Sequence, residues 1–510
     1  MAAEPPPGEG ATGSAPAAGT TDAALLRSLL PLTTVVSIGA VIVALDALIV
    51  NVALETMSGR LHAPLSTIQW VVTGYTLSLA MVIPLGGWAG HRFGHRRLWM
   101  WSLVAFVASS TLCGLSWSAW SLIAFRVLQG IGGGLIIPTG QSIVIQAAGG
   151  RRLGSVMGRL NLPLLIGPVL GPTLGGLLID SLGWRSIFFV NVPICVVVLV
   201  LGLRYVPRDA PEPGRGVDWV GLALFSPGLV GIVFGLSDMA GPQGPTATSA
   251  VALLVGVVLV AGYFAHARTV GSEHSLIDAA LFARRSFLAP VTVGFLFNLL
   301  MSGALVLLPL YWQLDRGESA LRAGLLVMPQ GIGSLITLSV IGRLTDRYGA
   351  RRLAPVGIVL AVCGTLPYVF LGPTTSYAVL CVALLVRGMG VSCLATPAYA
   401  AAYQSLGRPQ IPRATTAYNI TSRVGGAVGV ALAVLVLAQQ MDRALPGSRG
   451  VTLSAQAVQR VRTEPHLAVS VAHAFGWSFA VLAVVTAAVA IPAFFLPRFL
   501  PRPGGGRVPG

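Results

Sequence analysis

Asp46 is the residue whose chemical type and position most directly suggest a function. It lies deep inside a long apolar stretch that begins near residue 30, roughly 20 Å from that end at about 1.5 Å per helical residue. An ionised carboxyl group there costs on the order of 3 kcal/mol, and burial favours its protonated form. The position predicts that Asp46 takes up and releases a proton. The alternative is a neutral or paired aspartate that only fixes packing.

Three arginines and one further acid complete the candidate coupling set. Arg126, Arg387 and Arg423 lie in otherwise apolar stretches. An arginine stays protonated, so each is expected to hold a partner rather than to carry the proton. For Arg387 and Arg423, backbone carbonyls are equally good partners. Glu55 follows near the outer end of the stretch that contains Asp46, where a solvated position is the alternative to coupling.

Helices that cross a membrane must position these residues. Of the 510 residues, 54% are hydrophobic and 10% are charged, and the mean hydropathy is +0.79, whereas a soluble domain carries about 25% charged residues. A membrane span needs roughly 20 apolar residues. The sequence predicts an all-α integral membrane protein with fourteen spans. They are expected near residues 30–54, 70–89, 98–117, 119–141, 160–180, 187–206, 217–238, 249–267, 286–312, 322–342, 353–372, 375–402, 418–440 and 473–497.

The composition argues against several other classes of protein. The formal net charge is +16, but every basic residue is an arginine and most arginines lie in segments predicted to be cytoplasmic. The charge therefore indicates membrane topology, with both termini cytoplasmic, and not nucleic-acid binding. The five cysteines lie in predicted spans without a CxxC pattern, which predicts neither disulfides nor a metal site. No G-x-x-x-x-G-K-[ST] motif occurs, so we expect no cofactor, no enzymatic activity and no ATP-driven step.

Two passages of the chain repeat, which predicts two related halves. "GGWAGHRFGHRR" (86–97) and "IGRLTDRYGARR" (341–352) share the pattern G-x-x-x-x-R-x-G-x-R-R, and "QGIGGGLIIPTG" (129–140) is similar to "RGMGVSCLATPA" (387–398). Such repeats are typical of secondary transporters that bind substrate between their halves. The predicted regions are a disordered tail (1–28), a six-helix bundle (29–206), a linker with helices seven and eight (207–268), a second bundle (269–498) and a tail (499–510).

The two arginine-rich loops are predicted to be gating loops between paired helices, with glycine supplying backbone freedom. The first copy has His91 at the position where the second has Asp346. The second loop then carries more of the gating, or His91 adds pH sensitivity, or the substitution is simply tolerated. The predicted gating residues are Gly87, His91, Arg92, Gly94, Arg96, Gly342, Asp346, Arg347, Gly349 and Arg351.

Residues 165–180, "LIGPVLGPTLGGLLID", combine the apolar content of a span with several glycines and prolines. The small residues recur every four positions, so they form a stripe that a second helix can approach closely. Each proline withholds an amide and favours a bend. The prediction is a tight hinge, and ordinary small-residue packing is the alternative. The stripe consists of Gly167, Pro168, Gly171, Pro172, Gly175 and Gly176.

These motifs together resemble the 14-spanner drug:proton antiporter branch of the major facilitator superfamily, over about residues 30–498. The segments that carry the resemblance, in order along the chain, are "ALDALIVNVAL" (44–54), "RVLQGIGGG" (126–134), "GPVLGPTLGG" (167–176), "GWRSIFFVNVP" (183–193), "VDWVGLAL" (217–224) and "TTAYNITSRVGGAVG" (415–429). The resemblance implies a role for Arg126 in proton coupling and a hinge in the fifth span that limits leakage. Where this branch often has proline, this chain has Glu55.

The resemblance implies proton-coupled efflux of hydrophobic or amphipathic drugs or antibiotics across a bacterial plasma membrane, by a protein that acts as a monomer and is driven by the proton gradient. An importer or facilitator of a small metabolite is the alternative on the same fold. Amphipathic side chains suit an adaptable substrate cavity, although aromatic residues near span ends also serve as interface anchors. The cavity candidates are Trp70, Tyr75, Phe297, Asn298, Trp312, Gln313, Tyr399 and Tyr418.

Overall fold

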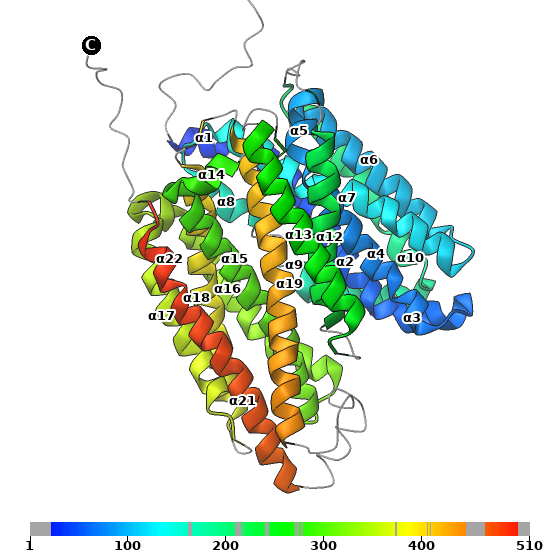
Figure 1. Ribbon diagram of the computed structural model, residues 1–510, viewed down its shortest axis with the longest axis vertical. Coiled ribbons are helices and arrows are strands. Elements are labelled where there is room, and N and C mark those ends of the chain that lie inside the picture. Colours follow the sequence, from blue (N-terminus) through cyan, green and yellow to red (C-terminus); the bar gives the residue numbers. More distant parts are fainter. Residues whose placement is uncertain are drawn as a thin grey trace, which may run out of the picture.

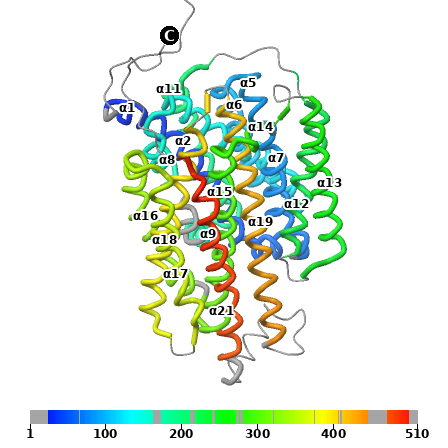
Figure 2. The backbone as a smooth tube through the Cα atoms, turned by 60° about the vertical axis from the view of Figure 1, so that its left-hand side comes forward, coloured from blue at the N-terminus to red at the C-terminus, as the bar shows by residue number. Residues whose placement is uncertain are grey.

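The computed structural model describes residues 22–161, 166–209, 218–239, 244–270, 279–372, 375–404, 410–444 and 465–497, with short pieces at 216, 275–276 and 406–407. The described residues form helices and no strands. Figures 1 and 2 show them as a bundle of long, roughly parallel helices. This confirms the predicted all-α class.

The helices of the first half are α1 (Asp22–Ser28), α2 (Leu30–Leu61), α3 (Leu65–Ile68), α4 (Trp70–Val82), α5 (Leu85–Phe93), α6 (His95–Gly114), α7 (Ala119–Ala148), α8 (Leu153–Asn161), α9 (Ile166–Leu182), α10 (Ser186–Phe189) and α11 (Asn191–Tyr205). The remaining helices are α12 (Trp219–Met239), α13 (Ala247–Val270), α14 (Ala279–Ala283), α15 (Arg285–Leu310), the π-helical turn η2 (Tyr311–Asp315), α16 (Ala320–Tyr348), α17 (Ala350–Val369), α18 (Tyr377–Tyr403), α19 (Ile411–Ala444), α21 (Pro465–Ala488) and α22 (Ala490–Phe494).

The number of membrane spans is only partly confirmed. Among the described residues, 11 helices are long and apolar enough to cross a membrane, or up to 12 if the bent pair Ser66–Val82 and Leu85–Phe93 is one span. Helices α6 and α9 occupy the third and fifth predicted ranges, but neither is among these 11 helices. α6 opens with basic residues, and α9 has only 17 residues. The chain is a multi-pass membrane protein, and the predicted count of fourteen is not confirmed.

The predicted N-terminal tail is partly helical. Residues 1–21 lie outside the described residues, as does the predicted tail at 499–510. Residues 22–28, which were also expected to be disordered, form α1. Leu25 is 2% exposed and belongs to the hydrophobic core, so burial of this side chain stabilises the short helix against the bundle.

The two repeated loops have the same local structure. Gly94 joins α5 to α6 with a φ of 87°, and Gly349 joins α16 to α17 with a φ of 79°. A positive φ is accessible to glycine at little cost, which explains why both copies of the motif have glycine there. The shared geometry supports the prediction of two related halves.

The end of the bundle that holds α1, α5, α8 and α14 lies at the top of Figure 1, and we call it the α8 end. Contacts between the first and second halves of the chain are found there. Gly154 of α8 packs against Gly342 of α16, so closely that a side chain on either would clash with backbone atoms. Asn419 of α19 donates to Gln141 of α7 at 2.9 Å. This end of the bundle is therefore closed by direct contact between the halves.

The inserted pair α12 and α13 joins the bundle through α12, which contacts both α4 and α19. Glycines on the two helices let their backbones approach: a Cβ on Gly231 would lie 3.1 Å from the Cα of Gly256. Trp70 of α4 stacks on Phe234 of α12, with ring centroids 6.1 Å apart. The insert therefore lies beside the boundary between the two halves.

Candidate functional site

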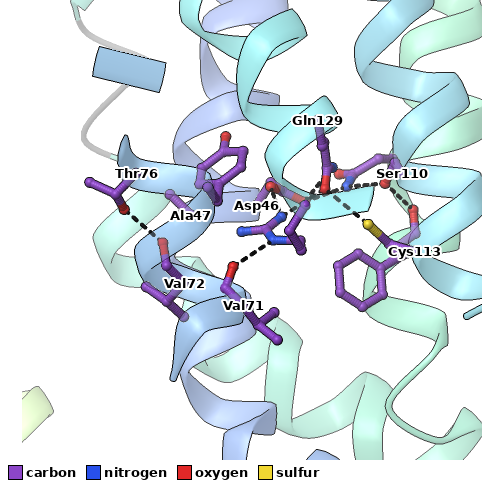
Figure 3. Close-up of polar contacts among 12 residues, drawn as sticks. Asp46, Ala47, Val71, Val72, Thr76, Ser110, Cys113 and Gln129 are labelled. Atoms are coloured by element: carbon purple, nitrogen blue, oxygen red, sulfur yellow. Dashed lines mark hydrogen bonds and ion pairs between the residues drawn. The ribbon is translucent and has the colours of Figure 1, made fainter. Parts of the chain in front are cut away.

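Asp46 lies at the centre of a buried polar network in the first half (Figure 3). Its side chain is fully buried and forms an ion pair with Arg126, whose Nη1 lies 2.6 Å from Asp46 Oδ2. Gln129 Nε2 and Asn191 Nδ2 donate to Asp46 Oδ1 at 3.0 and 2.9 Å. The carboxylate thus accepts hydrogen bonds from three side chains on two other helices. The structure brings together the two residues that the sequence proposed for coupling.

Arg126 is held by more than the carboxylate. Its Nη1 also donates to Gln129 Oε1 at 2.8 Å, and its Nε donates to the carbonyl oxygen of Val71 at 3.2 Å. Its Cζ lies 3.9 Å from the ring centroid of Tyr75. The Nη2 atom is buried and has no hydrogen-bond partner among the described residues. The guanidinium is therefore fixed in place, with the two N–H groups of Nη2 remaining for a further partner.

Asn191 and Ser110 belong to this network and were not singled out by sequence reasoning. Asn191 Nδ2 donates to Ser110 Oγ at 3.0 Å as well as to Asp46. Ser110 Oγ in turn donates to the carbonyl oxygen of Phe188 at 2.9 Å. Asn191 and Phe188 lie in "GWRSIFFVNVP", so an asparagine inside that apolar motif was the available signal.

Local sequence explains why the helices converge on Asp46. α7 begins with a capping box, in which Ser118 Oγ accepts from the backbone of Ser121 and Ser121 Oγ accepts from that of Ser118. A Cβ on Gly132 of α7 would lie 2.7 Å from the backbone nitrogen of Phe106, so only glycine allows α6 and α7 to pack this closely. These features place Arg126 and Gln129 on the face of α7 that meets α2.

The predicted hinge packs against the helix that carries Asp46. A Cβ on Gly171 of α9 would lie 3.1 Å from the Cβ of Leu48, and one on Gly175 would lie 3.4 Å from Ile49. The expected close approach of a second helix is therefore present, and that helix is α2. Gly176 meets no atom within 4 Å. Gly167, Pro168 and Pro172 also lie in α9, but their packing lies outside the described part of the structure.

The secondary coupling candidates do not join this network. Glu55 is exposed. Arg387 is buried in the second half, where it donates to Gln330 Oε1 at 2.5 Å and to the carbonyl oxygen of Leu300 at 3.3 Å. Arg423 is partly buried on α19 and forms no hydrogen bond or ion pair with a described residue. None of the three is hydrogen-bonded to or ion-paired with Asp46 or Arg126 in the described part of the chain.

The second gating loop contacts the opposite half. Asp346 accepts from the backbone N–H groups of Gly154 and Ser155 at 2.9 and 3.0 Å, and from the hydroxyl of Ser155. A carboxylate at the N-terminus of α8 accepts hydrogen bonds from backbone N–H groups that have no partner within the helix. Its negative charge also interacts favourably with the positive end of the helix dipole. Arg347 is exposed, and the Cζ of Arg351 lies 4.8 Å from the ring centroid of Phe494.

The first gating loop is capped from within its own half. Asp209 accepts from the backbone N–H groups of His95 and Arg96 at the start of α6, and its Oδ2 lies 3.2 Å from His95 Nδ1. Burial raises the pKa of Asp209, but these hydrogen bonds outweigh burial and hold it below its ordinary value.

His91 is buried, with its ring 5.7 Å from that of His95. Gly87 lies against α19, and a Cβ there would lie 3.5 Å from Thr416 Oγ1. Arg92 is exposed.

The predicted cavity residues fall into separate places. Tyr75 contacts Arg126, whereas Tyr399 and Tyr418 pack against each other with ring centroids 4.5 Å apart. Trp312 is fully buried in the core of the second half, between Tyr311 and Tyr377. The side-chain amides of Asn298 and Gln313 donate to the backbone carbonyls of Gly294 and Pro309, four residues earlier in the chain. Trp70 is exposed, and Phe297 is partly buried. Among these residues, Tyr75 directly adjoins the Asp46 network.

Comparison with known proteins decides the family. Residues 36–430 match the Major Facilitator Superfamily. The chain belongs to this superfamily. A solved double-tryptophan variant of XylE has the same fold, with a TM-score of 0.64, 14% identity and coverage of 93% of this chain and 97% of that one. The human organic anion transporter MFSD10 (TETRAN) gives a TM-score of 0.56 at 16% identity, covering 89% of this chain and 99% of that one.

Several bacterial members of the superfamily are similar over most of their length. The Multidrug resistance protein B homolog of Mycobacterium tuberculosis is 35% identical over 480 residues, which cover 90% of this chain and 88% of that protein. The Multidrug export protein EmrB of Escherichia coli is 31% identical, with 79% of each protein covered. The Methylenomycin A resistance protein of Streptomyces coelicolor is 29% identical, covering 80% of this chain and 86% of that protein.

Proposed function

We propose that this transporter exports hydrophobic or amphipathic drugs from a bacterial cell in exchange for protons. Similarity to transporters named for multidrug export and antibiotic resistance supports drug efflux. The observation that supports proton coupling is the buried Asp46–Arg126 pair at 2.6 Å. An ionisable group inside a membrane span is expensive, and it is a functional candidate by default.

Protonation of Asp46 is the proposed coupling step. While Asp46 is ionised, Arg126 and the two amides hold it in the closed network of α2, α7 and α11. A proton on the carboxyl group removes the charge that Arg126 balances. The guanidinium, whose two Nη2 N–H groups are already unpaired among the described residues, then requires a different partner. This change in pairing alters the relative stability of conformations with different helix packing around Asp46.

The α8 end supplies the element that responds. Asp346 at the N-terminus of α8 and the contact between Asn419 and Gln141 join the halves in the described conformation. We propose that this end faces the cytoplasm, as the arginine bias indicates, and that it opens to admit the drug. α9, which packs on α2 through Gly171 and Gly175, links movement of the first half to the Asp46 network.

The proton gradient is a sufficient energy source for this exchange. One charge crossing about 150 mV releases on the order of 3.5 kcal/mol. That energy sustains a concentration ratio of several hundredfold for a neutral drug. We propose that a monomer performs the cycle with no cofactor, because both the proton site and the contacts between halves lie within one chain.

Transport by the full chain in proteoliposomes tests the proposal. A susceptibility panel in cells with and without the intact gene first identifies an exported compound, which is then labelled. We expect an imposed pH gradient to drive its accumulation, and we expect Asp46→Asn to abolish that accumulation. Glu55→Gln is the matched control, since it neutralises an exposed acid on the same helix. Accumulation that ignores the gradient, or that Asp46→Asn leaves intact, would contradict proton coupling.

A further inference from the structure

The second half of the chain places positive charge inside its spans without negative charge. Its six predicted spans, from 286–312 to 473–497, contain no aspartate or glutamate, while Arg387 and Arg423 lie in their interiors. In the first half, by contrast, Asp46 balances Arg126. Two positive charges in the membrane interior therefore lack a carboxylate partner among the described residues. Charge retained at that cost is expected to meet a partner during function.

Arg423 is the more accessible of the two. It lies roughly 18 Å from the start of α19 and about 8 Å inside the predicted span 418–440, at about 1.5 Å per residue. It is partly exposed and makes no hydrogen bond or ion pair with a described residue. Its helix α19 contacts α7 and α5 of the first half, and Asn419, one turn before Arg423, donates to Gln141 of α7 at 2.9 Å. Arg423 therefore lies near the boundary between the halves, with its guanidinium donors free for a ligand.

Arg387 adds a second positive charge in a deeper position. It is 4% exposed, and its two acceptors, the Gln330 amide oxygen and the Leu300 carbonyl, are both neutral. These hydrogen bonds hold the guanidinium in place without cancelling its charge. Gln330 and Leu300 lie on α16 and α15, and α15 also packs along α19, the helix that carries Arg423. The field of Arg387 therefore favours an anion in the same part of the second half.

We infer that the preferred substrates are amphipathic organic anions, such as aromatic carboxylates, whose negative group pairs with Arg423. This inference rests on the proposed export function and specifies its substrate class. An arginine fork binds a carboxylate through two parallel N–H···O bonds, and low local polarity strengthens that pairing. The apolar body of the substrate would contact the surrounding apolar helices. A quaternary ammonium compound of the same shape would be repelled by the uncompensated arginines.

Equilibrium dialysis of the full chain in lipid nanodiscs tests this selectivity. The probes are 4-(1-pyrenyl)butyrate, its primary amide and the corresponding trimethylammonium compound, with empty nanodiscs as the blank. We expect the carboxylate to bind at least about tenfold more tightly than the amide, and the ammonium compound to bind most weakly. Failure of the carboxylate to bind, or equal or tighter binding of the amide or ammonium compound, would overturn the inference.

Variants locate the selectivity. Arg423→Gln should reduce the ratio of carboxylate affinity to amide affinity to about one, while Arg423→Lys should keep part of this preference for the carboxylate. Arg322→Gln is the charge-matched control, because Arg322 is an exposed arginine that pairs with Glu318 at 3.3 Å. An unchanged ratio in Arg423→Gln would contradict the assignment.

Folding of these variants is itself informative. Removing an unpaired charge should leave the melting temperature of Arg423→Gln unchanged or higher, so a variant that fails to fold would show a structural partner and count against the inference. Dialysis uses no proton gradient. Its result is therefore independent of the transport test on Asp46, and either proposal can fail alone.

Discussion

Arg126 and Arg423 lie in opposite halves of the transporter, on α7 and α19, two helices that contact each other. Arg126 is fully buried, ion-paired with Asp46 and bonded to Gln129 and a backbone carbonyl. Arg423 is partly exposed and has no such bond among the described residues. The same residue type is therefore locked by a counter-charge in one half and left available in the other. The difference is the basis of our proposals that the proton binds in the first half and the charged group of the substrate in the second.

The largest expected effect is on stability, when one member of the buried pair is removed. Arg126→Gln leaves the Asp46 carboxylate buried without its counter-charge, which should lower the free energy of unfolding by about 3–5 kcal/mol. Arg423→Gln removes no ion pair and should change it little. Denaturant unfolding in detergent micelles measures both variants.

Two controls sharpen that comparison. The double variant Asp46→Asn/Arg126→Gln should regain much of the lost stability, because neither buried charge remains. The loss in Arg126→Gln should also shrink as pH falls, since a protonated Asp46 needs no counter-charge. Equal losses in Arg126→Gln and Arg423→Gln would mean that the two arginines do not differ as described.

Asn191 should have the next largest effect. Asn191→Leu removes the donor shared by Asp46 and Ser110, which should cost about 1–3 kcal/mol of stability. The ionised form of Asp46 loses more than the protonated form, so the pH profile of export should move to higher pH. Asn298→Leu is the control, because Asn298 bonds only to the backbone of its own helix among the described residues. A loss of stability with an unmoved pH profile would reduce Asn191 to a packing residue.

The two gating loops allow a second comparison between the halves. Asp346→Asn weakens the cap on α8 and should favour opening of the α8 end by about 0.5–2 kcal/mol. The first loop is capped by Asp209 of its own half, so His91→Asn in that loop should have a smaller effect. Spin labels on the exposed positions 92 and 352, in a chain without native cysteines, report the separation of the halves. A larger change in His91→Asn would reverse the assignment of the gate.

Asp209 should give the smallest effect, and it depends on pH. Asp209→Asn weakens the cap at the start of α6 and should cost about 1 kcal/mol near neutral pH. Because the pKa of Asp209 is lowered in the folded protein, its stabilisation is present above the ordinary aspartate pKa and is lost as pH falls through the folded value. Melting curves of wild type and variant should therefore converge in acid. Curves that diverge in acid would contradict the lowered pKa.

Much of the fold could be predicted from sequence, because a membrane span is defined by local apolar length. Local apolar length does not reveal contacts between distant segments, and for this reason the predicted and observed structures differ in two places. α1 forms because Leu25 packs against the core, a contact that the Ala- and Pro-rich composition of the tail does not reveal. Basic residues at the start of α6 directly precede the third predicted span, and the fifth predicted span begins in α8 and continues in α9, so the count of fourteen depends on more than length.

The candidate site was predicted in part. An isolated acid and an arginine in apolar stretches are visible one by one, and Asp46 and Arg126 do meet. Asn191 was missed because an uncharged amide in an apolar motif is a weaker signal than a charged residue. Its role depends on the packing of α11 against α2 and α6. Aromatic type alone did not distinguish Tyr75, which touches Arg126, from Trp312, which fills the core.

The proton site can be tested directly by infrared difference spectroscopy of the purified transporter during a pH titration. The account predicts a carboxylic acid C=O band that appears as pH falls, is absent in Asp46→Asn and persists in Glu55→Gln. A titrating band that survives in Asp46→Asn, or the absence of any band that depends on Asp46, would contradict the assignment of the proton to the first half.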